Sequence, residues 1–289
     1  MRPPVPTSNP CMPVISARRS DVAQTQTTRW LTRALRLLRL SAHLIRGLLI
    51  VQFIYPRRTH ELRLVLMKRW SRQLLGILRV TPHLTSPSHA QAVGAPCMVV
   101  ANHISWLDIF VINAYYPVRF VAKSEIRAWP LIGTLCSKTG TLFVERVRRR
   151  DAHRINEMIG RALAEGDRVA VFPEGTTTDG SVVQHFHANL LQSAIDRNTP
   201  LHPVALQYST VNGSRCVAAG YVGEQTLMAS MIAILAQPEI IAGIGFLAAV
   251  HPAGRSRREL ARRTETAIVE ALAVPLVHTQ PVSPAGHSA

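Results

Sequence analysis

The sequence is poor in acidic residues and in cysteine. It has 17 Asp and Glu residues against 33 Lys and Arg, a formal net charge of +16. Its four cysteines, Cys11, Cys97, Cys136 and Cys216, form no Cys-x-x-Cys pair. This spacing favours neither a disulfide framework nor a zinc site. We therefore expect a reducing compartment, with the last three cysteines as small buried hydrophobic residues.

The sequence also lacks a serine-nucleophile motif and, near the N-terminus, a long uncharged run. There is no Gly-x-Ser-x-Gly segment, which argues against a hydrolase with a Ser-His-Asp triad. The uncharged run that follows Arg46, from Gly47 to Pro56, has ten residues, whereas a membrane-spanning helix needs about 20. Two apolar runs, 227–236 and 240–250, are separated by Pro238 and Glu239, so we expect a helix and then a strand there.

Positive charge is concentrated near the N-terminus. Between Arg29 and Leu84 lie twelve of the 33 basic residues and one acid, Glu61. From Arg29 to Tyr55 the basic side chains share an arc of about 140° on a helix. Leucines and other apolar residues recur on the opposite side. This pattern predicts a basic amphipathic helix in a membrane interface. A single tilted membrane span stays open as an alternative.

Composition divides the chain into four parts. Residues 1–28 are rich in Pro, Ser, Thr and Gln and are expected to be a disordered leader. Residues 29–80 are expected to form a membrane-binding helical pair, with the second helix over Thr59–Val80. We expect one globular domain over residues 81–274 and a disordered tail from Pro275 to the end, residues 275–289.

Short apolar runs alternate with helical patterns from about residue 96. The expected buried strands are Cys97–Ala101, Arg119–Ala122, Thr141–Val144, Val169–Phe172 and Leu201–Gln207. The expected helices are Trp106–Tyr115, Asp151–Glu165, Asn189–Arg197, Leu227–Ala236 and Glu259–Leu272. This alternation predicts an α/β sheet flanked by helices.

His103 and Asp108 are the first candidate catalytic residues. They lie in Asn-His-Ile-Ser-Trp-Leu-Asp, directly after the strand that ends at Ala101. Five residues along a helix turn by about 500°, so the pair can meet only if His103 precedes the helix and Asp108 lies in its first turn. Asn102 or Ser105 would then cap that helix. The carboxylate would hold one ring nitrogen and leave the other as a base for a hydroxyl.

A second polar segment, Phe-Pro-Glu-Gly-Thr-Thr-Thr at 172–178, also follows a strand. Its glycine and hydroxyls can offer donors to a phosphate, although Pro-Glu-Gly is also common in turns. Arg146 and Lys123 follow two further strands. Each is either a ligand of an anionic head group or a solvated surface cation. Ligands of open α/β sheets bind beyond the carboxyl ends of strands, where all these residues lie.

The chain resembles a known family at four segments. NHISWLD, GTLFVER, FPEGTTT and LHPV occur in this order. As an ordered set they resemble the motifs of the glycerolipid acyltransferases, which act on lysophosphatidic acid and related lysophospholipids. The resemblance covers about residues 35–272. The segment AKSEIRAWPLIG at 122–133 is also similar to a family segment in which a Lys faces the head-group phosphate.

The resemblance implies a mixed sheet flanked by helices and a role for each motif. His103 would be the general base on the acceptor hydroxyl, and Asp108 would orient it. The acceptor's phosphate region would be bound by Arg146, Glu174, Gly175 and Thr176, with Lys123 assisting. Pro203 would shape the pocket near the acyl donor. No metal, cofactor or covalent acyl-enzyme is implied, and acyl-CoA or an acyl-carrier protein would be the co-substrate.

One position departs from the family pattern. Many members have Arg after Glu-Gly-Thr, and this chain has Thr177. The implied acceptor is 1-acyl-glycerol-3-phosphate, giving phosphatidic acid, but the lost cation leaves a lyso-ornithine-type aminolipid as the alternative.

The expected partners are a lysolipid and an anionic membrane, at the cytoplasmic face of the inner (plasma) membrane. A nucleic-acid-binding protein is the alternative from another class, because net charge permits it. The leucine-rich face of the basic segment suits lipid better.

Overall fold

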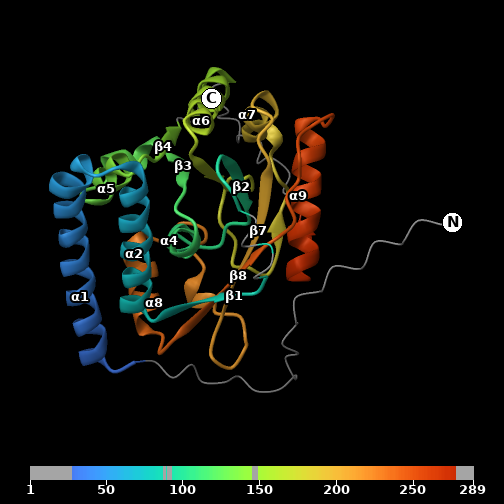
Figure 1. The fold of residues 1–289 in the computed structure, drawn as a ribbon. Helices are drawn as coiled ribbons and strands as arrows, with labels where there is room; N and C mark the ends of the chain where they lie inside the picture. The colour runs from blue at the N-terminus through green and yellow to red at the C-terminus, as the bar shows by residue number, and fades with distance from the viewer. Residues whose placement is uncertain (1–27, 87–88, 90–92, 145–148, 278–289) are drawn as a thin grey trace, which may run out of the picture.

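A seven-stranded sheet runs through the middle of the protein, in the order β1-β8-β7-β2-β5-β3-β4 (Figure 1). The computed structural model describes residues 28–86, 89, 93–144 and 149–277, without the side chains of 149–152. The strands of this sheet are β1 (Val80–Leu84), β2 (Cys97–Ala101), β3 (Arg119–Lys123), β4 (Leu142–Val144), β5 (Arg168–Val171), β7 (Leu201–Ser209) and β8 (Ile240–Phe246). Neighbouring strands are parallel except β7 and β8. The predicted α/β class with a mixed sheet is confirmed.

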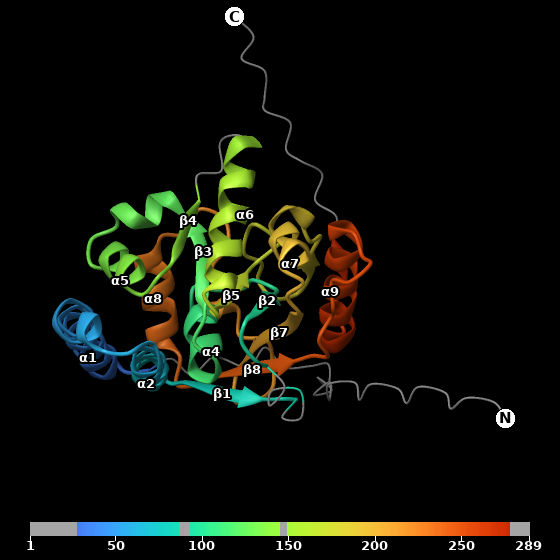
Figure 2. The same cartoon turned by 45° about the horizontal axis from the view of Figure 1, so that its top comes forward.

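Helices cover both faces of the sheet (Figure 2). One face carries α2 (His60–Leu78), α4 (Leu107–Tyr115) and α8 (Leu227–Ala236), and the other carries α6 (Arg149–Ala164), α7 (Gln192–Asp196) and α9 (Arg257–Leu272). The sheet has a hydrophobic core on each face, and strand β2 contributes to both. All five of its residues are buried, and their side chains point alternately to the two faces. Cys97, Val99 and Ala101 belong to the first core, whereas Met98 and Val100 belong to the second.

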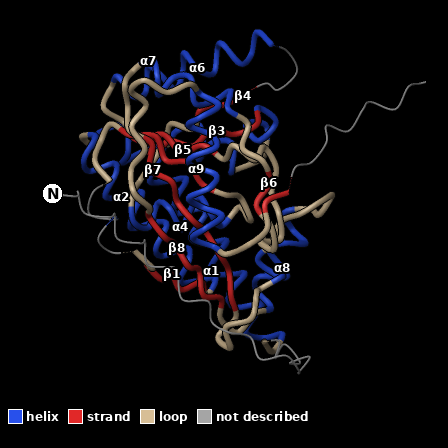
Figure 3. Tube along the Cα trace, turned by 90° about the vertical axis from the view of Figure 1, so that its right-hand side faces the viewer, coloured by secondary structure: helices blue, strands red, loops and turns tan. Residues whose placement is uncertain are grey.

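Shorter elements complete the fold. Helix α5 spans Ile132–Lys138, and 3-10 helices span Tyr55–Arg57, Ser124–Ala128, Ala188–Leu191 and Val217–Ala219. Strands β6 (Val183–Gln184) and β9 (Leu276–Val277) pair with each other, and β6 lies apart from the main sheet (Figure 3). Strand β9 corrects the prediction that the chain is disordered from Pro275. Residues 278–289 lie outside the described residues, as do residues 1–27 of the predicted leader.

The second predicted helix is also corrected at its end. It stops at Leu78 because Arg79 adopts the left-handed conformation, with φ 57°. The chain then turns directly into β1, in which Val80 pairs with Ile240 of β8. Neither β1 nor α5 was predicted, because their short sequences show no clear apolar period.

The first helix, α1 (Trp30–Leu49), packs on α2 and α8 rather than on the sheet. Its contact with the protein combines polar and apolar side chains, because Leu40 is buried in the first core on the same helix as Arg36 and His43. Arg36 donates to three carbonyls at the end of α8, with distances of 2.6 Å to Gln237, 3.1 Å to Leu235 and 3.3 Å to Pro238. His43 is buried and stacks on Trp70 at 4.6 Å between ring centroids.

The predicted apolar stripe of α1 therefore points outward. The exposed large apolar side chains of this helix and its extension are Trp30, Leu31, Leu35, Leu37, Leu38, Ile45, Leu49, Phe53 and Ile54. An apolar face turned away from the protein needs an apolar environment to bury it. With its π-helical and 3-10 extension the helix runs from Trp30 to Arg57, and it is long and apolar enough to cross a membrane by length and composition.

The contact between α1 and α2 generates a prediction for two helix glycines. An alanine Cβ at Gly47 would lie 2.7 Å from Trp70 Nε1, whereas one at Gly76 would meet no atom within 4 Å. We expect Gly47→Ala to destabilise the protein by about 1–3 kcal/mol through overpacking. Gly76→Ala should stabilise it by up to about 1 kcal/mol through helix propensity. Thermal unfolding in detergent measures both, and equal shifts for the two variants would contradict the packing.

Candidate active site

The two polar motifs meet at the carboxyl edge of neighbouring strands. His103 follows β2 and Phe172 follows β5, and β2 and β5 pair in parallel with Val100 opposite Val171. The loops are joined by the Thr178 amide, which donates to the His103 carbonyl at 2.9 Å. The arrangement expected from the two strand ends is therefore present.

His103 and Asp108 form the predicted pair. The distance from His103 Nδ1 to Asp108 Oδ2 is 2.8 Å, and Asp108 lies in the first turn of α4. The carboxylate is fully buried, while the imidazole is 21% exposed. Because an ionised carboxylate accepts only, the hydrogen bond assigns the proton to Nδ1 and leaves Nε2 as the acceptor.

Asp108 is held by three further donors. Its Oδ2 accepts from the amides of Ile104 at 2.8 Å and Ser105 at 3.0 Å. Its Oδ1 accepts from the Tyr208 hydroxyl at 2.7 Å. Burial and the neighbouring Asp108 carboxylate hold the pKa of Tyr208 well above its usual range, so this hydroxyl stays a donor. Four donors offset the cost of burying the charge.

The predicted side-chain cap of α4 is wrong. Its N-cap is Trp106, with no capping side chain. Asn102 instead exchanges two hydrogen bonds with the Leu206 backbone, at 2.8 and 3.0 Å. The amide thereby continues the pairing of β2 with β7 past Ala101, and this fixes where the His103 loop begins.

Phe172 supports the imidazole from one side. Its ring stacks on His103 with centroids 3.9 Å apart and planes 10° apart, and Phe120 stacks behind it at 5.9 Å. The apolar stack covers one face of His103 and restricts its rotation. Phe172 was read from sequence only as the end of a strand.

Glu174 occupies a different place from the one that the resemblance implies. It is 3% exposed. Its Oε1 accepts from the His103 amide at 2.6 Å, and its Oε2 accepts from the Gln184 amide at 2.9 Å. Both oxygens therefore position backbone rather than a substrate phosphate. Burial raises the pKa of Glu174 to about 7, while these two hydrogen bonds act in the opposite direction.

The residues after Glu174 form a turn. Gly175 has φ 74°, a conformation in which an L side chain is strained. Thr176 is exposed at the turn, and the Thr177 hydroxyl donates to the Tyr221 carbonyl. Thr177 thus closes the loop onto a backbone group and offers no cation.

Two of the remaining predicted site residues, Lys123 and Pro203, lie on strands of the sheet. Lys123 is exposed at the carboxyl end of β3. Pro203 is buried within β7 opposite Val100, and its carbonyl accepts from Leu247 at 2.9 Å. Arg146 lies outside the described residues. Among the residues that the structure describes, no three His, Cys, Asp or Glu side chains gather as metal ligands.

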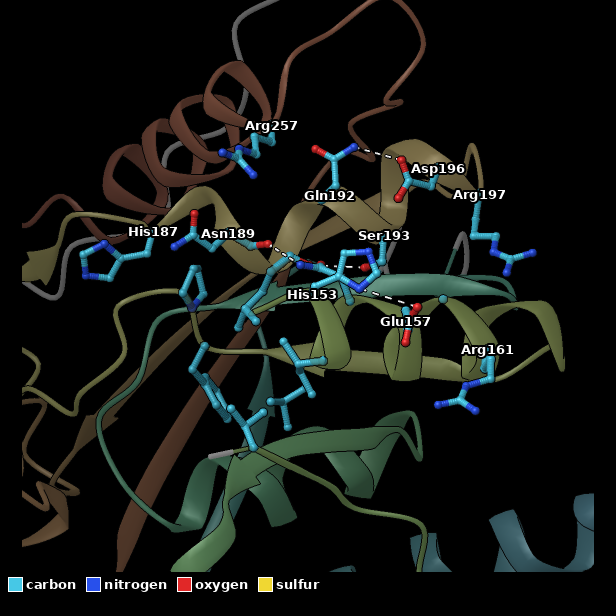
Figure 4. Close-up of a pocket in the computed structure, with 18 of the residues that line it drawn as sticks. His153, Glu157, Arg161, His187, Asn189, Gln192, Ser193, Asp196, Arg197 and Arg257 are labelled. Atoms are coloured by element: carbon cyan, nitrogen blue, oxygen red, sulfur yellow. Dashed lines mark hydrogen bonds and ion pairs between the residues drawn. The ribbon is translucent and has the colours of Figure 1, made fainter. Parts of the chain in front are cut away.

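A cavity of about 1340 Å³ adjoins this site. Phe172, Pro173 and Gly175 line it, together with residues of α6, α7 and the turn before α7 (Figure 4). Phe172 both lines this cavity and stacks on His103, so the cavity borders the candidate pair, although neither His103 nor Asp108 is among its lining residues.

Tyr208 is the residue that sequence reasoning missed most clearly. It lies 100 positions from Asp108, and only the pairing of β7 beside β2 brings the two together. The sequence offered one signal for Tyr208, which was its position near the end of the strand that begins with Leu-His-Pro-Val.

A histidine held by a buried aspartate at the carboxyl edge of a sheet, near a cavity, is an arrangement suited to acid–base chemistry. A family profile described as Acyltransferase matches residues 80–207. A lyso-ornithine lipid O-acyltransferase of Pseudomonas aeruginosa is 36% identical over 182 residues, which cover 63% of this chain and 70% of the relative. One of Brucella abortus is 34% identical over 193 residues, which cover 62% and 72%.

A 1-acyl-sn-glycerol-3-phosphate acyltransferase of Neisseria gonorrhoeae is 41% identical over 136 residues, which cover 47% of this chain and 52% of the relative. The crystal structure of the 1-acyl-sn-glycerophosphate acyltransferase PlsC of Thermotoga maritima shares the fold. Its TM-score is 0.61 at 20% identity, covering 83% of this chain and 96% of that one. The chain belongs to the acyltransferase family, which confirms the resemblance.

Tyr208 generates a kinetic prediction. Tyr208→Phe removes one hydrogen bond to a charged carboxylate, so we expect kcat to fall about tenfold. KM should stay unchanged, because the fully buried hydroxyl contacts Asp108 and not a substrate. Tyr115→Phe, on α4, is the matched control and should keep full kcat. A lower melting temperature with unchanged kcat would mean that Tyr208 is only structural.

Glu174 generates a prediction about pH. Its folded pKa of about 7 exceeds the ordinary value of 4.5, so the folded state binds this proton more tightly. The resulting stability is present below pH 4.5 and is lost as pH rises to about 7, by about 3 kcal/mol in total.

Glu174→Gln cannot ionise and lacks this dependence. The stability of the variant relative to wild type should therefore improve between pH 5 and pH 7.5. Chemical denaturation at both pH values measures the difference. A constant difference would mean that the two backbone hydrogen bonds cancel the effect of burial.

Proposed function

We propose that this acyltransferase moves a fatty acyl group from a thioester to the hydroxyl of a lysolipid, with His103 as general base. The observation that carries the proposal is the Asp108–His103 pair, in which Nδ1 is held by the buried carboxylate and Nε2 is left as the acceptor on a partly exposed imidazole. Nε2 takes the proton of the acceptor hydroxyl while the oxygen of that hydroxyl attacks the thioester carbonyl carbon. The tetrahedral intermediate then expels the thiolate, which takes the proton back from the imidazolium.

Asp108 stabilises the imidazolium that forms between these two steps. No acyl group is attached to the protein in this scheme. Glu174 is a positioning residue, because both its oxygens hold backbone amides around His103. Lys123, Arg146, Gly175 and Thr176 remain our proposed contacts for the acceptor's head group.

The first proposed acceptor is 1-acyl-glycerol-3-phosphate, which would give phosphatidic acid. It is the substrate named for the Neisseria relative. A lyso-ornithine lipid is the second candidate, and one observation favours it. The Thr177 hydroxyl is engaged by the Tyr221 carbonyl, at the position where many relatives have an arginine for a phosphate. The Pseudomonas and Brucella relatives are named for that acceptor.

Membrane association is supported by α1, whose apolar side chains face outward while Arg36 and His43 face the protein. We propose that the enzyme works at the cytoplasmic face of the inner membrane. The basic N-terminal segment supports this placement, because it suits an anionic leaflet.

The test is thiol release with both donors and both acceptors, using wild type and His103→Ala. Release should require a lysolipid and should fall at least about 1000-fold in the variant, because the general base is lost. His83→Ala is the matched control, since His83 is exposed on β1. The faster acceptor decides between the phosphate and the aminolipid. Full activity of His103→Ala, or no release with any donor, would overturn the proposal.

A further inference from the structure

The cavity beside the active site is larger than the catalytic step needs. It extends from Phe172 and Pro173 to Arg161 on α6, Arg197 after α7 and Arg257 on α9 (Figure 4). Its volume of about 1340 Å³ exceeds that of ordinary small-molecule pockets, which are roughly 300–1,000 Å³. A long ligand, reaching far from the reacting carbonyl, fits this shape.

The three arginines are unpaired. Among the described residues, none of them makes a side-chain hydrogen bond or ion pair. The two acids of the cavity have partners of their own, since Glu157 lies 3.5 Å from His153 and Asp196 accepts from Gln192 at 2.8 Å. Arginines grouped around a cavity without carboxylate partners are suited to phosphate.

The arginines lie toward the edge of the sheet opposite His103. Helix α6 begins after the carboxyl end of β4 and ends just before the amino end of β5. From His153 to Arg161 the helix rises about 12 Å at 1.5 Å per residue. Arg197 precedes the amino end of β7 and lies over α6, with its Nε 3.5 Å from the position of a Cβ on Gly160.

This separation distinguishes between the two substrates. In 1-acyl-glycerol-3-phosphate, the phosphate is attached to the carbon next to the reacting hydroxyl, so it stays close to His103. In the donor, a long pantetheine arm separates the thioester from its phosphate groups. Only the donor places phosphate at the far end of the cavity while its carbonyl is at His103.

We propose that this cavity binds the phosphorylated pantetheine arm of the acyl donor, with Arg161, Arg197 and Arg257 on its phosphate groups. The inference rests on the proposed function and adds the donor's place in it. Acyl-CoA and acyl-carrier protein share this arm, and the experiment separates the two sources.

The experiment compares palmitoyl-CoA, palmitoyl-carrier protein and palmitoyl-pantetheine, which lacks phosphate. Arg161→Gln and Arg197→Gln should each raise KM for a phosphorylated donor about tenfold, the loss of one charge-assisted hydrogen bond. KM for palmitoyl-pantetheine and for the lysolipid should not change. Arg154→Gln on α6 and Arg258→Gln on α9 are matched controls outside the cavity lining.

A rise for the carrier protein alone would indicate contact with its protein surface and would overturn the proposal. A rise for both phosphorylated donors identifies the phosphate of the shared arm as the group bound, and a rise for palmitoyl-CoA alone identifies the nucleotide. Either result supports the proposal. Unchanged KM values, a rise for the lysolipid instead, or an equal rise for palmitoyl-pantetheine would overturn it. Calorimetry with free CoA provides a readout without turnover. If wild type binds CoA and Arg161→Gln/Arg197→Gln does not, the cavity assignment stands even where no acyl transfer is detected.

Discussion

The buried carboxylate of Asp108 is the group on which the rest of the site depends. A fully buried charge is costly unless donors surround it, and Asp108 has four donors from two parts of the chain, the 103–105 loop and Tyr208. The two loop amides shape the segment after β2, Tyr208 ties that segment to β7, and His103 takes its orientation from the remaining bond. Loss of the carboxylate would leave all four donors without a partner at once.

The acidic and the basic side chains of this region differ in burial. The two carboxylates, Asp108 and Glu174, are buried and hold the His103 loop through backbone amides and the imidazole. The arginines of the cavity have no such partners among the described residues. The acidic side chains are therefore engaged inside the fold, while the arginines of the cavity stay accessible to an anionic ligand.

The N-terminal helix turns most of its large apolar side chains away from the protein. Arg36 donates to carbonyls at the end of α8 and His43 stacks on Trp70, so polar side chains share the contact with the protein with the buried Leu40. Leucines and aromatic residues are left outward. In the function that we propose, a lipid environment buries that face and holds the domain at the surface where lysolipids are found.

Local sequence patterns predicted most strands of the main sheet and the geometry of the His103–Asp108 pair. Apolar runs identified six strands of the main sheet, and the spacing of His103 and Asp108 required a loop followed by the first turn of a helix, as the structure has it. Order of strands, however, depends on contacts between distant segments. Only that order places Tyr208 on Asp108, turns Glu174 from a predicted phosphate ligand into a support for His103, and gathers three arginines from separate helices around one cavity. Local patterns record which side chains are buried together along one element, and the tertiary structure decides which elements meet, because that choice depends on packing over the whole sheet.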